Sequence, residues 1–141
     1  LVGGSGDDLM VVTGVGKGQV TTMIGGYGRD VMQGEDDGVE VYRFKEGHTG
    51  TGLRADVIRV FGEEDVIDLS VIDANGAAHG DGSFKWVGRN GDPRPGEVGY
   101  HEATIEGAHA VVVTFDYGQG DQEIVLFQPH DTHLSAADFM L

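Results

Sequence analysis

Several kinds of residue are scarce or missing in this chain of 141 residues. It contains no cysteine, which excludes a disulfide framework and any thiolate metal or redox site. Lysine and arginine together number 9 against 24 aspartates and glutamates, which gives a formal charge of −15. So negative a chain argues against nucleic acid or an anionic membrane as a partner. No apolar run approaches the ~18 residues of a membrane span, so membrane insertion is not expected.

Catalytic signatures are also missing from the sequence. It has no H-E-x-x-H zinc motif and no G-x-S-x-G nucleophile elbow. His130 and His133 flank a short loop, and we interpret them as exposed loop residues rather than as a metal pair. Neither a Sec-type signal peptide nor an initiator methionine is visible at Leu1. We therefore expect a non-catalytic fragment of a longer protein, with any catalytic domain upstream.

Glycine, by contrast, is abundant, and some of the glycines recur at regular intervals. Residues 3–11 and 25–33 both fit the nonapeptide G-G-x-G-x-D-x-U-x, in which U is a large apolar residue, at every specified position. Glycine lets the backbone turn tightly at positive φ, so that carbonyl oxygens can point inward. The aspartate adds a carboxylate, and the apolar residue two places later points into the core. Calcium prefers six to eight oxygen ligands at roughly 2.3–2.6 Å, more than one loop supplies, so two stacked loops would share an ion.

The spacing of the two copies predicts which loops are neighbours. Asp8 and Asp30 lie 22 residues apart, which is two nine-residue steps plus four. Between them, residues 13–21 fit the same frame but carry Gly18 in place of the aspartate. We interpret this segment as a degenerate turn on the opposite side that binds no ion of its own. A two-sided coil of this kind brings Asp8 and Asp30 together at the best-formed site.

Residues 34–42 depart further from the nonapeptide. They place Val41 at the apolar position, but they lack the second and third glycines and the aspartate. We expect the coil to end there, and we leave Asp36 and Asp37 open as further ligands. Acidic clusters at residues 7–8, 35–37 and 63–65 all fall in or beside glycine turns. Like charges so placed repel one another until a divalent cation neutralises them.

Short apolar or alternating segments, separated by turn residues, fill the rest of the chain. Turn signals include Asn75-Gly76 and residues 90–93. Such spacing favours an all-β fold, and residues 134–139, with Ser135 as a cap, are the single helical candidate. The expected strands are residues 9–12, 19–24, 39–44, 56–61, 66–69, 84–87, 97–100, 109–115 and 122–127.

The nonapeptides resemble the calcium-binding repeat of RTX proteins. From Asp56 onward the chain is similar to the C-terminal domain of serralysin-type secreted metalloproteases. Residues 56–61 and 64–70 look like that family's D-x-I-x-x-F and D-x-I-D-L-S blocks. Phe84 and residues 96–100 resemble its F…G-E-L-x-Y strand pair, and the ending 134–141 matches L-[ST]-A-A-D-F-x-L. The resemblance spans essentially the whole chain, with its blocks in the family's order.

The resemblance implies an all-β fold with two parts. Residues 1–44 would form a parallel β-roll of calcium-binding repeats, and residues 45–141 a β-sandwich-like C-terminal cap. Asp56 and Asp65 are expected either to hold another calcium where roll and cap meet or only to cap turns. The implied ligands of the best-formed calcium site are the carboxylates of Asp8 and Asp30 and the carbonyls of Gly4, Gly6, Gly25 and Tyr27.

The resemblance also implies export by a type I secretion system, which reads an uncleaved C-terminal signal. That signal is an acidic residue followed by apolar ones, a form that residues 138–141 match. Intracellular calcium lies far below the ~10⁻⁴–10⁻³ M dissociation constants of extracellular calcium modules, so the repeats would fold only outside the cell. We expect a secreted, extracellular bacterial module whose partners are calcium ions, the type I machinery and the upstream domain of a hydrolase or polysaccharide-modifying enzyme.

An alternative is a carbohydrate- or partner-binding module of an RTX adhesin or epimerase. Trp86, Tyr100 and Tyr117 would then form an aromatic platform for sugar. Trp86 alternates with its neighbours, however, and so shares a strand face with Phe84. That pattern favours packing of Trp86 in the core.

Overall fold

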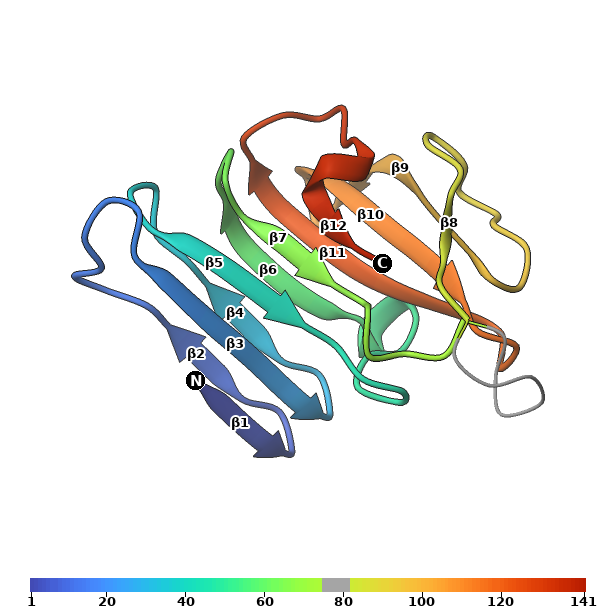
Figure 1. The fold of residues 1–141 in the computed structure, drawn as a ribbon, viewed down its shortest axis with the longest axis horizontal. Coiled ribbons are helices and arrows are strands. Elements are labelled where there is room, and N and C mark those ends of the chain that lie inside the picture. Colours follow the sequence, from blue (N-terminus) through green and yellow to red (C-terminus); the bar gives the residue numbers. More distant parts are fainter. Residues whose placement is uncertain (75–81) are drawn as a thin grey trace.

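The fold is all-β, as expected, and consists of two sheets (Figure 1). The computed structural model describes residues 1–74 and 82–141, so the turn expected at Asn75-Gly76 lies outside the described residues. Within that part the only helical segments are two short 3-10 turns, Gly52–Arg54 and Ala136–Asp138. The second of these turns lies inside the expected helical segment, and Ser135 caps it as expected.

The first sheet has five strands and is parallel throughout. The second sheet has seven strands; along it the first three pairs are parallel, the next two are antiparallel and the last is parallel. In spatial order the first contains β1 (Val2–Ser5), β3 (Val20–Tyr27), β5 (Val39–Arg43), β7 (Val66–Asp68) and β12 (Phe139–Met140). The second contains β2 (Leu9–Val11), β4 (Val31–Gln33), β6 (Asp56–Phe61), β11 (Asp121–Pro129), β10 (Ala108–Asp116), β9 (Glu97–Ile105) and β8 (Lys85–Trp86).

From β1 to β7 the chain alternates between the two sheets, one strand in each. Consequently the loops that follow β1, β3 and β5 stack at one end. We call it the Asp30 end, because Asp30 lies in the loop that follows β3. The loops that follow even-numbered strands stack at the other, which we call the Glu40 end. The alternation continues through β6 and β7 and therefore beyond the expected end of the coil at residues 34–42. In each sheet, a strand before residue 44 also pairs with a strand after it, although we expected the roll to end and the cap to begin at that residue.

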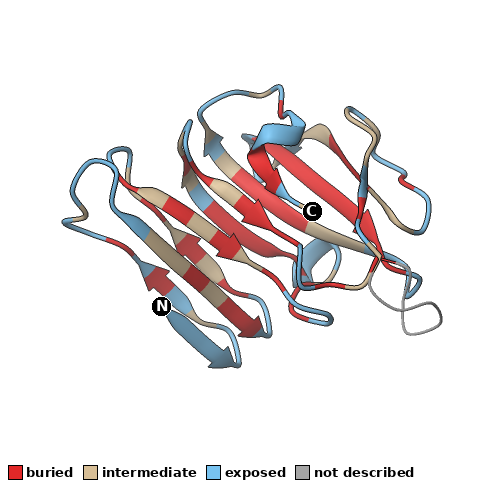
Figure 2. Ribbon diagram, in the orientation of Figure 1, coloured by how far each residue is buried: buried red, intermediate tan, exposed pale blue. Residues whose placement is uncertain are grey.

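The core lies between the sheets, where equivalent positions of successive strands form buried rows (Figure 2). Met10, Met32 and Ile58 are paired neighbours on β2, β4 and β6. Both methionines stand at the apolar position of a nonapeptide, and both are buried as the motif predicts. The facing row from the first sheet is Met23, Tyr42 and Ile67.

The expected register of β5 is wrong by one residue. Tyr42 and Glu40 are buried, whereas Val41 is only partly buried. The reason is the pairing with β3, which sets Tyr42 opposite buried Met23 and so turns the even-numbered residues of β5 inward. A buried glutamate is the consequence.

Candidate metal site

The loops of the two nonapeptides lie directly on one another at the Asp30 end. Gly4 pairs with Gly26 between β1 and β3, and the Gly6 N–H donates to the carbonyl of Tyr27 at 2.8 Å. Gly4, Gly6, Gly26 and Gly28 have φ between 106° and 126°, which side chains rarely adopt. A Cβ on Gly26 would also collide with the carbonyl of Gly4. Glycine therefore sets both the turn and the close stacking of the loops.

A chain of hydrogen bonds joins the aspartates of successive loops. The Asp8 N–H donates to Oδ1 of Asp30 at 2.9 Å, and the Asp30 N–H donates to Oδ1 of Asp56 at 2.9 Å. The Asp56 N–H in turn donates to Oγ1 of Thr49 at 2.9 Å, and that hydroxyl donates to the carbonyl of Glu123 at 2.6 Å. We call Asp8, Asp30 and Asp56 the aspartate stack. Thr49 closes the stack where a further repeat would place another aspartate.

Each carboxylate of the aspartate stack keeps one oxygen without a partner. Oδ2 of Asp8, Asp30 and Asp56 is buried and accepts no hydrogen bond. Asp30 and Asp56 are fully buried. A buried ionised carboxylate is costly unless a cation or sufficient hydrogen bonds compensate its charge. Burial accordingly raises the pKa of Asp56 to about 8, and it raises that of Asp30, with the Asp8 charge adding to the effect.

One unpartnered oxygen, Oδ2 of Asp8, lies in the same small space as a backbone carbonyl of the predicted ligand set. A Cβ built on Gly3 would lie 2.5 Å from the carbonyl oxygen of Gly25 and 2.7 Å from Asp8 Oδ2, so both oxygens border the space beside Gly3. The carbonyls of Gly4 and Gly6 lie against Gly26 and Gly28. These carboxylate and carbonyl oxygens are the donors that a hard divalent cation takes. The residues present therefore fit a calcium ion between the two loops.

Asp56 and Asp65 do not meet, so of the two arrangements that we expected, a shared calcium site or turn caps, the shared site is not formed. Asp56 opens β6, whereas Asp65 follows its far end, and six extended residues span roughly 17 Å. Both oxygens of Asp65 accept backbone N–H groups, from Glu40 and Gly62, each at 2.8 Å. Asp56 instead belongs to the aspartate stack, which gives this stack a third carboxylate beyond the two that the nonapeptides predict.

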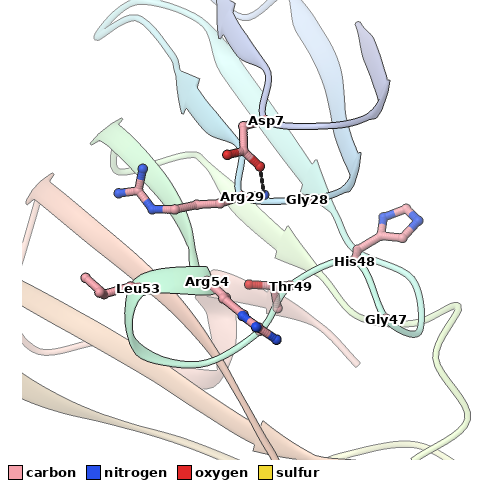
Figure 3. Close-up of a pocket in the computed structure, with 9 residues that line it drawn as sticks. Asp7, Gly28, Arg29, Gly47, His48, Thr49, Leu53 and Arg54 are labelled. Atoms are coloured by element: carbon pink, nitrogen blue, oxygen red, sulfur yellow. Dashed lines mark hydrogen bonds between the residues drawn. The ribbon is translucent and has the colours of Figure 1, made fainter.

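A cavity of about 480 Å³ opens beside the aspartate stack (Figure 3). Asp7 lies on its wall and accepts the Arg29 N–H at 2.8 Å. The side chains of Arg29 and Arg54 both line this cavity but point to different sides of it in Figure 3. They do not converge on one point, and we assign no ligand to this cavity.

Histidines contribute little to a metal site here. His48 is buried against Tyr27, with ring centroids 5.3 Å apart, and burial lowers its pKa. His130 and His133 each approach a different acid, Asp138 at 3.3 Å and Asp131 at 3.5 Å, so they do not form a pair. Across residues 1–74 and 82–141, no three His, Cys, Asp or Glu side chains form a group that could hold a metal. Backbone carbonyls must therefore supply most ligands of any ion at the aspartate stack.

The three rings of the proposed aromatic platform pack against other residues of the core to different extents. Tyr100 and Tyr117 are only 4% and 7% exposed. Trp86 stacks on Tyr100 with ring centroids 5.9 Å apart and also contacts Phe139 at 4.9 Å. The Tyr117 hydroxyl accepts the Gly47 N–H at 3.1 Å. Tyr100 and Tyr117 are therefore buried in the core, and Trp86 is partly buried against it.

Comparison with known proteins gives no match to a family model and none to a curated protein. In the described part of the chain, no helix is long and apolar enough to cross a membrane.

Proposed function

We propose that this chain is a non-catalytic calcium-binding module that becomes ordered when calcium binds. The observation that carries the proposal is the aspartate stack, in which three carboxylates each leave a buried oxygen without a partner. The stacking distance is set by glycines that no other residue could replace without collision or strain. A site of this kind is held in shape by the protein but is electrostatically incomplete without a cation.

Calcium is the cation that the donor set favours. All candidate ligands are carboxylate or carbonyl oxygens, which suit calcium and magnesium, and the chain has no cysteine to select a softer metal. Calcium accepts irregular geometry with many carbonyl ligands, whereas magnesium requires near-ideal octahedral geometry and usually keeps several waters. The strand alternation between two parallel sheets is consistent with the β-roll of RTX repeats, which we propose as the finer description of the fold.

Calcium binding would couple to folding because the chain is so acidic. Without a cation, a formal charge of −15 and 25 glycines both oppose the ordered state. A ligand that binds only the folded state stabilises it by mass action. The repeats would therefore be less ordered and less stable at intracellular calcium levels than outside the cell.

We further propose that the tail directs type I secretion of a larger extracellular protein. In the folded state Asp138 caps the last 3-10 turn, and β12 pairs with β7. An exporter could read residues 138–141 only before they join the sheet, which low intracellular calcium would allow. On the side of the two sheets away from β12, the edge strands β1 and β2 expose Val2 and Leu9 at 72% and 68%, and Val20 of the neighbouring β3 is 65% exposed. An upstream domain of the parent protein would cover this edge.

A calcium titration by calorimetry and circular dichroism tests the proposal. Asp30→Asn keeps an oxygen that can accept the Asp8 N–H but removes the charge, so it should abolish the calcium-induced gain in order. Asp92→Asn removes the same charge from an exposed position in the cap and serves as the matched control. Unchanged calcium binding by Asp30→Asn would refute the assignment of the aspartate stack.

A further inference from the structure

Asparagine is rare in this chain, and glycine follows it each time. The sequence contains only Asn75 and Asn90, and the next residues are Gly76 and Gly91. The side-chain carbonyl carbon of an asparagine can be attacked by the backbone amide nitrogen of the next residue, and a glycine there has no side chain to shield that nitrogen. Asn75 lies outside the described residues. Asn90 lies in the connection between β8 and β9, where the structure defines its surroundings.

The connection that carries Asn90 is held against β9. The N–H groups of Tyr100 and Asn90 both donate to the carbonyl of Gly88, at 3.0 and 2.8 Å. A Cβ on Gly99 would collide with the carbonyl of Asn90, so the loop lies directly on the strand. Asn90 is half-buried, whereas Gly91 is exposed. The fold therefore fixes this backbone but leaves the peptide bond between the two residues open to water.

A histidine of β9 lies next to this peptide bond. A Cβ built on Gly91 would lie 3.0 Å from Nδ1 of His101 and 3.1 Å from its Cγ. Because the Cβ position and the amide nitrogen of one residue are roughly 2.5 Å apart, the imidazole also lies near the Gly91 N–H. Nδ1 of His101 is buried and has no hydrogen-bond partner. An unprotonated imidazole nitrogen of this kind can accept a proton.

The side-chain amide of Asn90 is polarised by a neighbouring backbone donor. Its Oδ1 accepts the Asp92 N–H at 3.0 Å. A donor at this place stabilises the negative charge that develops on Oδ1 when the side-chain carbonyl carbon is attacked. The loop and β9 thus bring together a nucleophilic amide nitrogen, a base and a polarised carbonyl group, which are the components of an acyl transfer.

We propose that Asn90 and Gly91 form a modification site at which His101, as general base, promotes conversion of Asn90 to aspartate and isoaspartate. Nδ1 of His101 takes the proton of the Gly91 amide, and the amide nitrogen forms a bond to Cγ of Asn90. The bond from Cγ to Nδ2 breaks, and Nδ2 leaves as ammonia with the proton that the imidazole returns. Water then opens the cyclic imide at either of its carbonyls, which leaves a carboxylate at residue 90.

The proposed reaction depends on the fold, which holds His101 against Gly91. Peptide mass mapping of the unaltered protein, incubated with calcium at neutral pH, measures the conversion of each asparagine. Folded Asn90 should convert roughly tenfold or more faster than Asn90 of the urea-unfolded chain, because a positioned general base accelerates proton transfer. In urea, where no base is positioned, Asn90 and Asn75 should convert at similar rates. Slower conversion of Asn90 in the folded protein than in urea would overturn the proposal, because the fold would then protect the amide.

His101→Gln tests the base itself. Glutamine keeps a polar side chain but has no basic nitrogen, so conversion of folded Asn90 should slow by roughly tenfold or more while that of Asn75 stays unchanged. A purely structural role of His101 predicts the opposite sign, because a loosened loop lets the amide react more freely. His109→Gln, at an exposed position on β10, is the matched control and should change neither rate.

An unchanged or faster conversion of Asn90 in His101→Gln would overturn the assignment of His101 as the base. If His101→Gln does not fold, the comparison of the folded and the urea-unfolded unaltered protein decides the question, since it requires no substitution.

Discussion

The backbone N–H of Asp30 donates a hydrogen bond at 2.9 Å to Oδ1 of Asp56, which lies 26 residues further along the chain. Asp30 belongs to a perfect nonapeptide, whereas Asp56 follows a connection of different length and composition. The contact shows that the β5–β6 connection, although it lacks the motif, returns the chain to the same position that a repeat would reach. The stability of the Asp30 end, and the calcium binding that we propose there, therefore depend on residues outside the repeats.

The raised pKa of Asp56 predicts how the free energy of unfolding varies with pH. An unfolded aspartate titrates near a pKa of about 3.9, whereas folded, calcium-free Asp56 has a pKa of about 8. Between these values the folded state holds a proton that the unfolded state has lost, so stability falls as pH rises. Saturating calcium binds the ionised form and should remove most of this decline. Melting temperatures from pH 5 to pH 9, with calcium and with EGTA, should therefore diverge as pH increases.

Asp56→Asn provides the control for that series. Its calcium-free melting temperature should decline less with pH than that of the unaltered protein, although Asp30, Glu40 and Asp65, whose pKa values are also raised, keep part of the decline. Parallel curves for the two proteins would show that Asp56 does not cause the pH dependence.

Thr49→Val tests the residue that closes the aspartate stack. Valine keeps the shape of threonine but leaves the buried Asp56 N–H without its acceptor, a loss of about 1–3 kcal/mol in the free energy of unfolding. Urea unfolding measures this effect. Thr51→Val, at an exposed threonine that makes no cap hydrogen bond, should change stability far less. Equal effects of the two substitutions would argue against the closing role of Thr49.

Gly26→Ala tests the stacking of the two nonapeptide loops. An alanine there would be strained at a φ of 110°, and its Cβ would collide with the carbonyl of Gly4, so the loops must separate. We expect calcium affinity to fall by at least tenfold in titrations. Gly107→Ala also places alanine at positive φ but meets no atom within 4 Å, so it should lower stability without changing calcium affinity. Retained affinity in Gly26→Ala would contradict the proposed geometry.

Deletion of residues 138–141 tests the proposed export signal. Fused behind a passenger protein and co-expressed with a matching type I exporter, the full chain should carry the passenger into the medium. The deletion should reduce export strongly and should reduce calcium binding less. The reason is that β12 pairs with β7 at the edge of the sheet, away from the nonapeptide loops. Export at the full level after deletion would show that these residues only complete the sheet.

The sequence predicted those parts of the site that obey a local pattern. Glycines at fixed offsets and an apolar residue after the aspartate led to the stacked loops, to Asp8 and Asp30, and to the buried positions of Met10 and Met32. Such features depend on a few adjacent residues and on simple backbone rules. They could be predicted without knowing the rest of the fold.

Features that depend on distant contacts could not be predicted in this way. Thr49 acquires its role through Glu123, 74 residues away, and no motif marks it. Glu40 is buried because β5 pairs with β3 in a register that the alternation of Val39 and Val41 argued against. Residues 45–55 break the nine-residue period, which concealed the place of Asp56 in the aspartate stack.

Anomalous diffraction from crystals grown with calcium tests the central claim most directly. We predict a calcium ion between the loops of residues 3–8 and 25–30, at roughly 2.3–2.6 Å from carboxylate oxygens of Asp8 and Asp30, with backbone carbonyls completing its shell. A well-ordered aspartate stack that shows no anomalous peak at millimolar calcium would contradict it.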